Sequence, residues 1–293
     1  MKNKGYSKAE LKARRRLKYL AVFVAIVIII TICFFVFVVL KNNIVKERID
    51  YSSENVADDI VSNSTPIVIN NVVLGASYKN TWVSSESYYF RNHNKITEVD
   101  VYNETGKKGK YKITNFTNPG SDGAFYVTID NPNISDEFVA VGASKNDVMM
   151  QKVTKISNIT DSDIEVVKKA LGKYFVFNTS IKINSIHSVT FDNENRGRII
   201  CVTNEVGKSS GAYSAIIYES NYGKTEIIKY NYVKDLKKSD EWPIYSFKFV
   251  LDLNQDSVNE LIIQETKEFE VKYDVIEFRG GKFTEVLSTV VKM

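Results

Sequence analysis

The longest hydrophobic run of the chain extends over residues 19–40, YLAVFVAIVIIITICFFVFVVL. Its 22 residues carry no charge. A helix of that length is about 33 Å long, which is enough to cross a hydrocarbon core of about 30 Å. The pattern therefore predicts a transmembrane helix at 19–40 that holds the protein in a lipid bilayer.

After this run the pattern of polar and apolar positions changes twice. Residues 41–65 are polar with scattered Ile and Val, which predicts a stalk. From 66 to 155, short apolar or alternating segments are separated by Asn, Gly, Ser and Asp, which predicts an all-β lobe. Its strands are expected at 67–69, 72–78, 81–83, 87–90, 96–102, 110–113, 124–129 and 138–141.

One helix is predicted at the start of a second β lobe, which spans 156–293. In NITDSDIEVVKKALGKY, Thr160 or Ser162 can cap the first turn, acidic residues follow, and Gly172 ends the helix. Apolar residues recur at helical spacing between these ends, so we expect this helix to connect the two lobes. The strands of the second lobe are expected at 175–177, 181–191, 198–203, 212–219, 225–232, 244–251, 260–264, 268–278 and 282–291.

The second lobe contains an internal repeat. FDNENRGRIICVTN followed by AYSAIIYESNYGKTEIIKY parallels LDLNQDSVNELIIQET followed by KYDVIEFRGGKFTEVLSTV. Each unit consists of an acidic loop, a strand, a hairpin and a further strand, at an offset of roughly 60 residues. The fold class expected from these patterns is therefore mainly β, with an N-terminal transmembrane helix and a two-lobed outer region.

Charge determines which side of the membrane each part occupies. Residues 1–18 contain eight basic residues and one acidic residue, which predicts a cytoplasmic basic tail and an extracytoplasmic C-terminal region. A cleaved signal peptide is the alternative, but its apolar region would be shorter and would precede a small-x-small cleavage site, which LKNNIVKERID lacks. The rest of the chain has 31 basic and 34 acidic residues, so nucleic acid is not an expected partner.

Oxygen-bearing side chains recur through the segment 252–260, DLNQDSVNE. Asp252, Asn254, Asp256 and Glu260 occupy positions 1, 3, 5 and 9, and the backbone carbonyl of Val258 fills position 7. Calcium takes six to eight oxygen ligands in a forgiving geometry, so these five residues are candidate ligands of a structural Ca²⁺ ion. The alternative is an acidic turn that joins two strands without metal.

The same loop resembles the D-x-[DN]-x-D-G-x-x-[DE] loop of FG-GAP/VCBS repeats, and residues 160–293 resemble paired FG-GAP-like units of Gram-positive surface proteins. The resemblance implies a membrane-anchored extracellular β protein, built as a partial propeller or a sandwich. Two positions depart from the family pattern: Ser257 stands where a left-handed Gly is usual, and Gln255 replaces another common Gly. In the first copy of the repeat, Arg198 stands near the place of the closing carboxylate, so that copy is predicted to hold no metal.

Catalytic motifs are missing from the sequence. His93 is expected in a surface turn, His187 in the core, and no G-x-S-x-G, H-E-x-x-H or phosphate-binding loop occurs. The sequence therefore favours a non-catalytic binding module whose partner is a surface protein or a cell-wall polymer. The basic run from Lys107 to Lys112 is either a contact for such a polymer or a solvated hairpin. A cell-envelope hydrolase that uses carboxylates, and a sensor that signals through the basic tail, are the alternatives.

Overall fold

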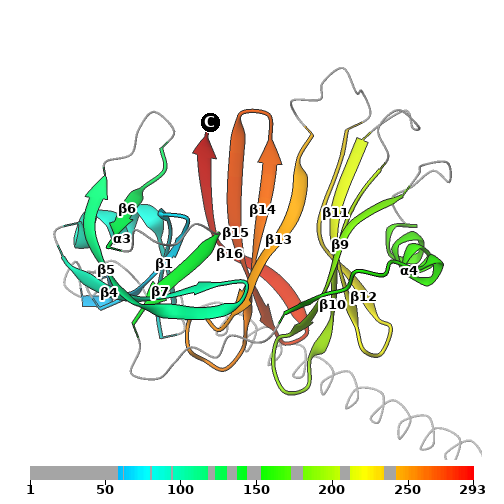
Figure 1. The fold of residues 1–293 in the computed structure, drawn as a ribbon, viewed down its shortest axis with the longest axis horizontal. Coiled ribbons are helices and arrows are strands. Elements are labelled where there is room, and N and C mark those ends of the chain that lie inside the picture. The colour runs from blue at the N-terminus through cyan, green and yellow to red at the C-terminus, as the bar shows by residue number, and fades with distance from the viewer. Residues whose placement is uncertain are drawn as a thin grey trace, which may run out of the picture. The chain divides into compact units, whose positions relative to one another are not determined.

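The computed structural model describes residues 59–61, 63–79, 81–93, 95–117, 123–130, 137–143, 153–172, 181–204, 212–233 and 242–293. All of them belong to one compact unit, Ala57–Met293. This unit is mainly β, with three antiparallel sheets and the helices α3 and α4 (Figure 1). The basic tail, the segment 19–40 and most of the stalk lie outside the described residues. Among the described residues, no helix is long and apolar enough to cross a membrane.

The first sheet is formed by the N-terminal strands of the unit. Its order is β1-β7-β4-β5-β6-β2-β3, and an additional pairing between β1 and β2 joins the strands β1, β7, β4, β5, β6 and β2 into a ring. Closure of this kind leaves few unpaired strand edges. The strands are β1 (Thr65–Ile69), β2 (Val72–Tyr78), β3 (Thr81–Ser84), β4 (Thr97–Asn103), β5 (Gly106–Thr117), β6 (Tyr126–Ile129) and β7 (Phe138–Gly142).

The prediction of a strand at 87–90 is wrong, because this segment lies in helix α3 (Ser85–Asn92). Aromatic residues favour strands, which explains the prediction. Ser84 caps the helix, since its hydroxyl accepts a hydrogen bond from a backbone N–H of the first turn at 3.3 Å. The ring of Tyr89 packs into the interior against Phe125, with ring centroids 4.6 Å apart, so tertiary packing and the cap decide the local structure.

The second and third sheets contain the two copies of the repeat. The second sheet has the order β12-β11-β10-β9-β8, and the third has the order β13-β14-β15-β16 (Figure 1). Each copy therefore forms three consecutive antiparallel strands of its own sheet. The strands are β8 (Thr154–Lys155), β9 (Lys182–Thr190), β10 (Arg196–Thr203), β11 (Ala212–Ser220), β12 (Thr225–Val233), β13 (Ile244–Leu251), β14 (Glu260–Lys267), β15 (Glu270–Arg279) and β16 (Lys282–Lys292).

The predicted helix is confirmed as α4 (Asp161–Leu171). Thr160 and Asp163 form a capping box at its start, since the Thr160 N–H donates to Asp163 Oδ2 at 2.8 Å. The helix lies in the sequence between β8 and β9, which are neighbours in the second sheet, so the expectation that it connects two lobes is wrong. Val167 and Leu171 are buried in an apolar cluster with residues of β9, β10 and β11, so α4 covers one face of the second sheet.

The third sheet is buried on both faces. Ile262 of β14 lies in an apolar cluster with residues of the first sheet, whereas its neighbours Leu261 and Ile263 lie in a cluster with residues of the second sheet. Successive side chains of a strand point to opposite faces, so each face of β14 contributes to a different core. This double burial explains why Leu261-Ile262-Ile263 is continuously apolar rather than alternating.

Equivalent residues of the two repeats face the same core. The sequence parallel aligns Ile216 with Ile276 and Tyr218 with Phe278, and all four lie in the cluster between the second and third sheets. The ring centroids of Tyr218 and Phe278 are 6.2 Å apart. The two sheets therefore present corresponding faces to each other.

Candidate metal centre

The segment 252–260 connects β13 to β14, where Leu251 and Glu260 form the last pair of the ladder. Leu253 anchors the loop, because its side chain is fully buried in the core shared with the first sheet. Two residues of the loop adopt the left-handed backbone conformation, Gln255 with φ 64° and Ser257 with φ 71°. The expectation of a left-handed residue at position 6 is thus confirmed. For residues other than glycine this conformation costs roughly 1–2 kcal/mol.

Hydrogen bonds from the backbone to acidic side chains hold the loop in this shape. Asp252 accepts from the N–H of Asp256 at 3.0 Å and from the N–H of Ser257 at 2.9 Å. Asp256 Oδ1 accepts from the N–H of Val258 at 2.9 Å. These are the contacts of a nested Asx turn, so the loop can keep its conformation without an ion.

Three carboxylates nevertheless converge at the base of the loop. Asp256, Glu260 and Glu277 each place an oxygen within 4.8 Å of the other two. Glu277 comes from β15, where the register pairs Leu261 with Ile276 and so brings Glu277 opposite Glu260. Like charges that lie opposite each other on neighbouring strands repel, so this arrangement needs a counter-charge or a proton.

Glu260 is the residue of this group that has a buried oxygen atom without a hydrogen-bond partner among the described residues. Its side chain is 0% exposed, and Oε2 accepts a hydrogen bond from the N–H of Leu253 at 2.7 Å. Its other oxygen, Oε1, is buried and has no hydrogen-bond partner among the described residues. Burial, followed by the negative charges of Asp256, Asp252 and Glu277, raises the pKa of Glu260 to about 9. Burial and the charge of Asp256 raise the pKa of Asp252 as well.

Arg279 supplies a positive charge from the exposed side of the cluster. Its Nη2 lies 3.1 Å from Asp256 Oδ2 and 3.0 Å from Glu277 Oε1, and its side chain is 56% exposed. Within the part of the chain that the structure describes, Arg279 forms no ion pair with Glu260. The guanidinium therefore neutralises the outer carboxylates and leaves the innermost one without a cation.

The structure brings only some of the predicted metal ligands together. Asp256 and Glu260 lie together, and they are joined by Glu277, which the spacing of acidic residues does not single out. Asp252 is not in that group, and Asn254 turns its Nδ2 toward Asp256 Oδ2 at 3.2 Å. The set of carboxylate donors, which includes Glu260 with its unpartnered Oε1, still fits a hard cation such as Ca²⁺ or Mg²⁺.

The corresponding region of the first repeat lacks the pair of opposed carboxylates. Asp192 Oδ1 accepts from the N–H groups of Glu194 and Asn195 at 2.8 and 2.7 Å, which again forms an Asx turn. On the strands that follow, Arg198 stands opposite Glu219 in the register, and its Nε donates to Glu219 Oε2 at 2.9 Å. The offset of 60 residues that aligns Ile216 with Ile276 puts Ile200 and Ile217 at the positions of Glu260 and Glu277, and the register pairs these two isoleucines. The first repeat therefore has two apolar residues opposite each other where the second repeat has two carboxylates.

The two loops lie side by side and are joined by one residue. The N–H of Asn259 donates to the carbonyl of Phe191 at 2.7 Å, and its Nδ2 donates to the carbonyl of Thr190 at 2.8 Å. The second loop is thereby fixed against the first at the position before Glu260.

Comparisons of the chain with protein-family models, with curated proteins and with solved structures found no match.

Proposed function

We propose that this chain is a membrane-anchored, extracytoplasmic binding module whose β region is stabilised by one calcium ion at the 252–260 loop. Asp256, Glu260 and Glu277 would hold the ion, together with the other oxygens of the loop. The main support for the metal site is Glu260, whose buried Oε1 lacks a partner among the described residues and whose carboxylate belongs to a cluster with Asp256 and Glu277. An ionised carboxylate in such a place requires a cation.

The comparison of the two repeats supports the same proposal. The positions of Glu260 and Glu277 are held in the first repeat by Ile200 and Ile217, which lie opposite each other and need no cation. The second repeat has Glu260 opposite Glu277, and no ion pair from another described residue reaches Glu260, so its cation would come from solution. Weak binding would be sufficient, because extracellular calcium modules operate with dissociation constants of about 10⁻⁴–10⁻³ M.

Thermal unfolding of the whole chain in detergent micelles tests the site. With calcium at ten times its dissociation constant we expect a gain of about 1.4 kcal/mol in the free energy of unfolding relative to chelator. Asp256→Ala should abolish the gain, whereas Glu194→Ala in the first loop, the matched control, should retain it. An unfolding midpoint that is the same in calcium and in chelator would leave the loop a metal-free turn.

The architecture proposed for the β region is a sandwich-like pair of FG-GAP-like units rather than a partial propeller. Neighbouring propeller blades are related by rotation about a central channel, so the front of one packs against the back of the next. Ile216 and Ile276, which are equivalent in the two repeats, instead meet in one core. This packing supports a face-to-face pair of sheets.

The anchor is supported by the hydrophobic run at 19–40 and by the basic excess before it. It implies a cytoplasmic N-terminus and a bilayer as the first partner, with a surface protein or wall polymer as the second. Protease treatment of intact cells tests this topology, because the region after residue 40 should be digested while the tail is protected. Protection of the whole chain would contradict it.

A carboxylate-dependent hydrolase is the second candidate, because a protonated glutamate beside ionised carboxylates can serve as a general acid. Glu260 has that environment, but its complete burial separates it from any polymeric substrate. We expect no turnover of cell-wall fragments. Turnover that is lost on changing one acid outside the 252–260 loop would establish the enzyme. The sensor alternative would be contradicted by deleting residues 2–18 without loss of a cytoplasmic partner.

A further inference from the structure

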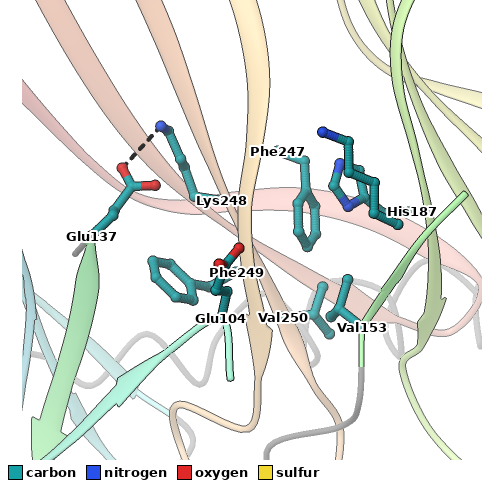
Figure 2. Close-up of a pocket in the computed structure, with 9 residues that line it drawn as sticks. Glu104, Glu137, Val153, His187, Phe247, Lys248, Phe249 and Val250 are labelled. Atoms are coloured by element: carbon teal, nitrogen blue, oxygen red, sulfur yellow. Dashed lines mark ion pairs between the residues drawn. The ribbon is translucent and has the colours of Figure 1, made fainter. Parts of the chain in front are cut away.

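A pocket of about 390 Å³ lies beside β13 and is lined by residues other than those of the metal centre (Figure 2). Residues of all three sheets contribute to it. Glu104 lies in the turn between β4 and β5 of the first sheet, and Glu137 directly precedes β7. The second sheet provides Lys155 and His187, and β13 provides the residues 247–250. Pockets for small ligands commonly have volumes of about 300–1,000 Å³ and occur where separate structural layers meet.

The charged side chains of the pocket divide between two walls. Glu104 and Glu137 belong to the wall formed by the first sheet, and Lys155 belongs to the wall formed by the second sheet, where the register pairs it with His187. Figure 2 shows Glu137 directed toward Lys248, and their ion pair measures 2.9 Å, so these two charges satisfy each other. No ion pair with another described residue engages Glu104 or Lys155. The pocket thus offers a ligand one free anion and one free cation on opposite walls.

The remaining surface of the pocket is apolar or aromatic. Val153 and Phe247 are partly exposed in the pocket, whereas Phe249 and Val250 are buried. The ring of His187 stacks on Phe247, with ring centroids 4.4 Å apart. Burial and the nearby Lys155 ammonium lower the pKa of His187 to about 4, so at neutral pH the imidazole adds no charge and can still exchange a hydrogen bond with a ligand.

We propose that this pocket binds a zwitterionic ligand, an amino acid or a short peptide with an apolar side chain, whose ammonium contacts Glu104 and whose carboxylate contacts Lys155. The apolar side chain of the ligand lies against Val153 and Phe247, which are the partly exposed apolar residues of the pocket. Charge-assisted hydrogen bonds to both ends select such a ligand over neutral molecules of similar size. The site is separate from the 252–260 loop and does not depend on calcium.

Calorimetric titration of the whole chain in detergent micelles, with empty micelles as the blank, tests the ligand class. The probes are L-leucine, L-leucyl-L-leucine, N-acetyl-L-leucine and L-leucinamide. The first two should bind, and the last two, which each lack one charge, should bind at least about tenfold more weakly, the factor that 1.4 kcal/mol represents. The ratio of the first two affinities shows whether the free amino acid or the peptide is preferred. Binding of neither zwitterion, or equal binding of the blocked compounds, would overturn the proposal.

Charge reversal of the two walls separates direct contact from a structural effect. Glu104→Lys and Lys155→Glu should each abolish binding, and the double reversal should restore it, because the ligand can then bind in the opposite orientation. Both side chains are exposed, so neither change should prevent folding. Glu194→Lys and Lys224→Glu, at exposed positions outside the pocket, are the matched controls and should leave binding unchanged. Single reversals that retain affinity, or a double reversal as weak as the single ones, would refute the assigned contacts.

Discussion

Replacing Glu260 by glutamine changes the charge of the buried carboxylate and preserves its shape. In the folded protein the pKa of Glu260 is raised from 4.5 to about 9, so the folded state binds its proton more tightly than the unfolded state does. The contribution of this group to stability is therefore fully present below pH 4.5 and is lost as the pH rises toward 9. Glutamine has no proton to lose, so the variant should not show this decline.

The size of the effect follows from the same two pKa values. Each pH unit between 4.5 and the pKa of the folded state lowers the free energy of unfolding by about 1.4 kcal/mol. In the absence of a metal ion, the free energy of unfolding of the wild-type protein should therefore be about 3 kcal/mol lower at pH 7 than below pH 4.5. Calcium should recover part of this loss, because the ion neutralises the carboxylate in place of the proton.

Urea unfolding of the whole chain between pH 5 and pH 9, with chelator present, measures this difference. The stability of the wild-type protein should fall relative to Glu260→Gln as the pH rises, and added calcium should reduce the gap for the wild type alone. Glu194→Gln, which removes an exposed carboxylate of the first loop, should follow the wild type. Parallel stability curves for wild type and Glu260→Gln would refute the reasoning.

Three further changes test other parts of the structure. Ser257→Gly should raise the free energy of unfolding by about 1 kcal/mol in urea, because glycine relieves the left-handed strain, and Ser257→Ala, which keeps that strain, should not. Arg198→Met should lower it by about 3 kcal/mol, because the buried carboxylate of Asp163 loses its cation; an unchanged unfolding midpoint would contradict this. His187→Asn should flatten the loss of stability as the pH falls from 6.5 toward 4, since the neutral imidazole is the form favoured by the folded state, and identical acid unfolding curves would count against it.

The sequence predicted the β architecture well where hydrophobic alternation alone decides the structure. The strands of both repeats and the helix α4 follow from apolar spacing, turn residues and capping. Helix α3 could not be predicted in this way. Its aromatic residues favour a strand, and only the cap at Ser84 and the packing of Tyr89 against the first sheet make the segment helical.

The candidate metal centre was predictable only as far as the loop itself. Asp256 and Glu260 are close in the sequence, and their spacing identified them. Glu277 enters the cluster through the pairing of β14 with β15, and this register is a property of the folded sheet that the spacing of acids does not contain. The unsatisfied Oε1 of Glu260 likewise depends on tertiary burial rather than on any local pattern.

Direct measurement of calcium binding tests the central claim. In flow dialysis with radioactive calcium, the whole chain in detergent should bind one ion saturably, with a dissociation constant of about 10⁻⁴–10⁻³ M. Glu260→Gln should lose this binding, and Glu194→Gln should keep it. Absence of saturable binding at millimolar calcium, or equal binding by Glu260→Gln, would contradict the account of the carboxylate cluster as a calcium site.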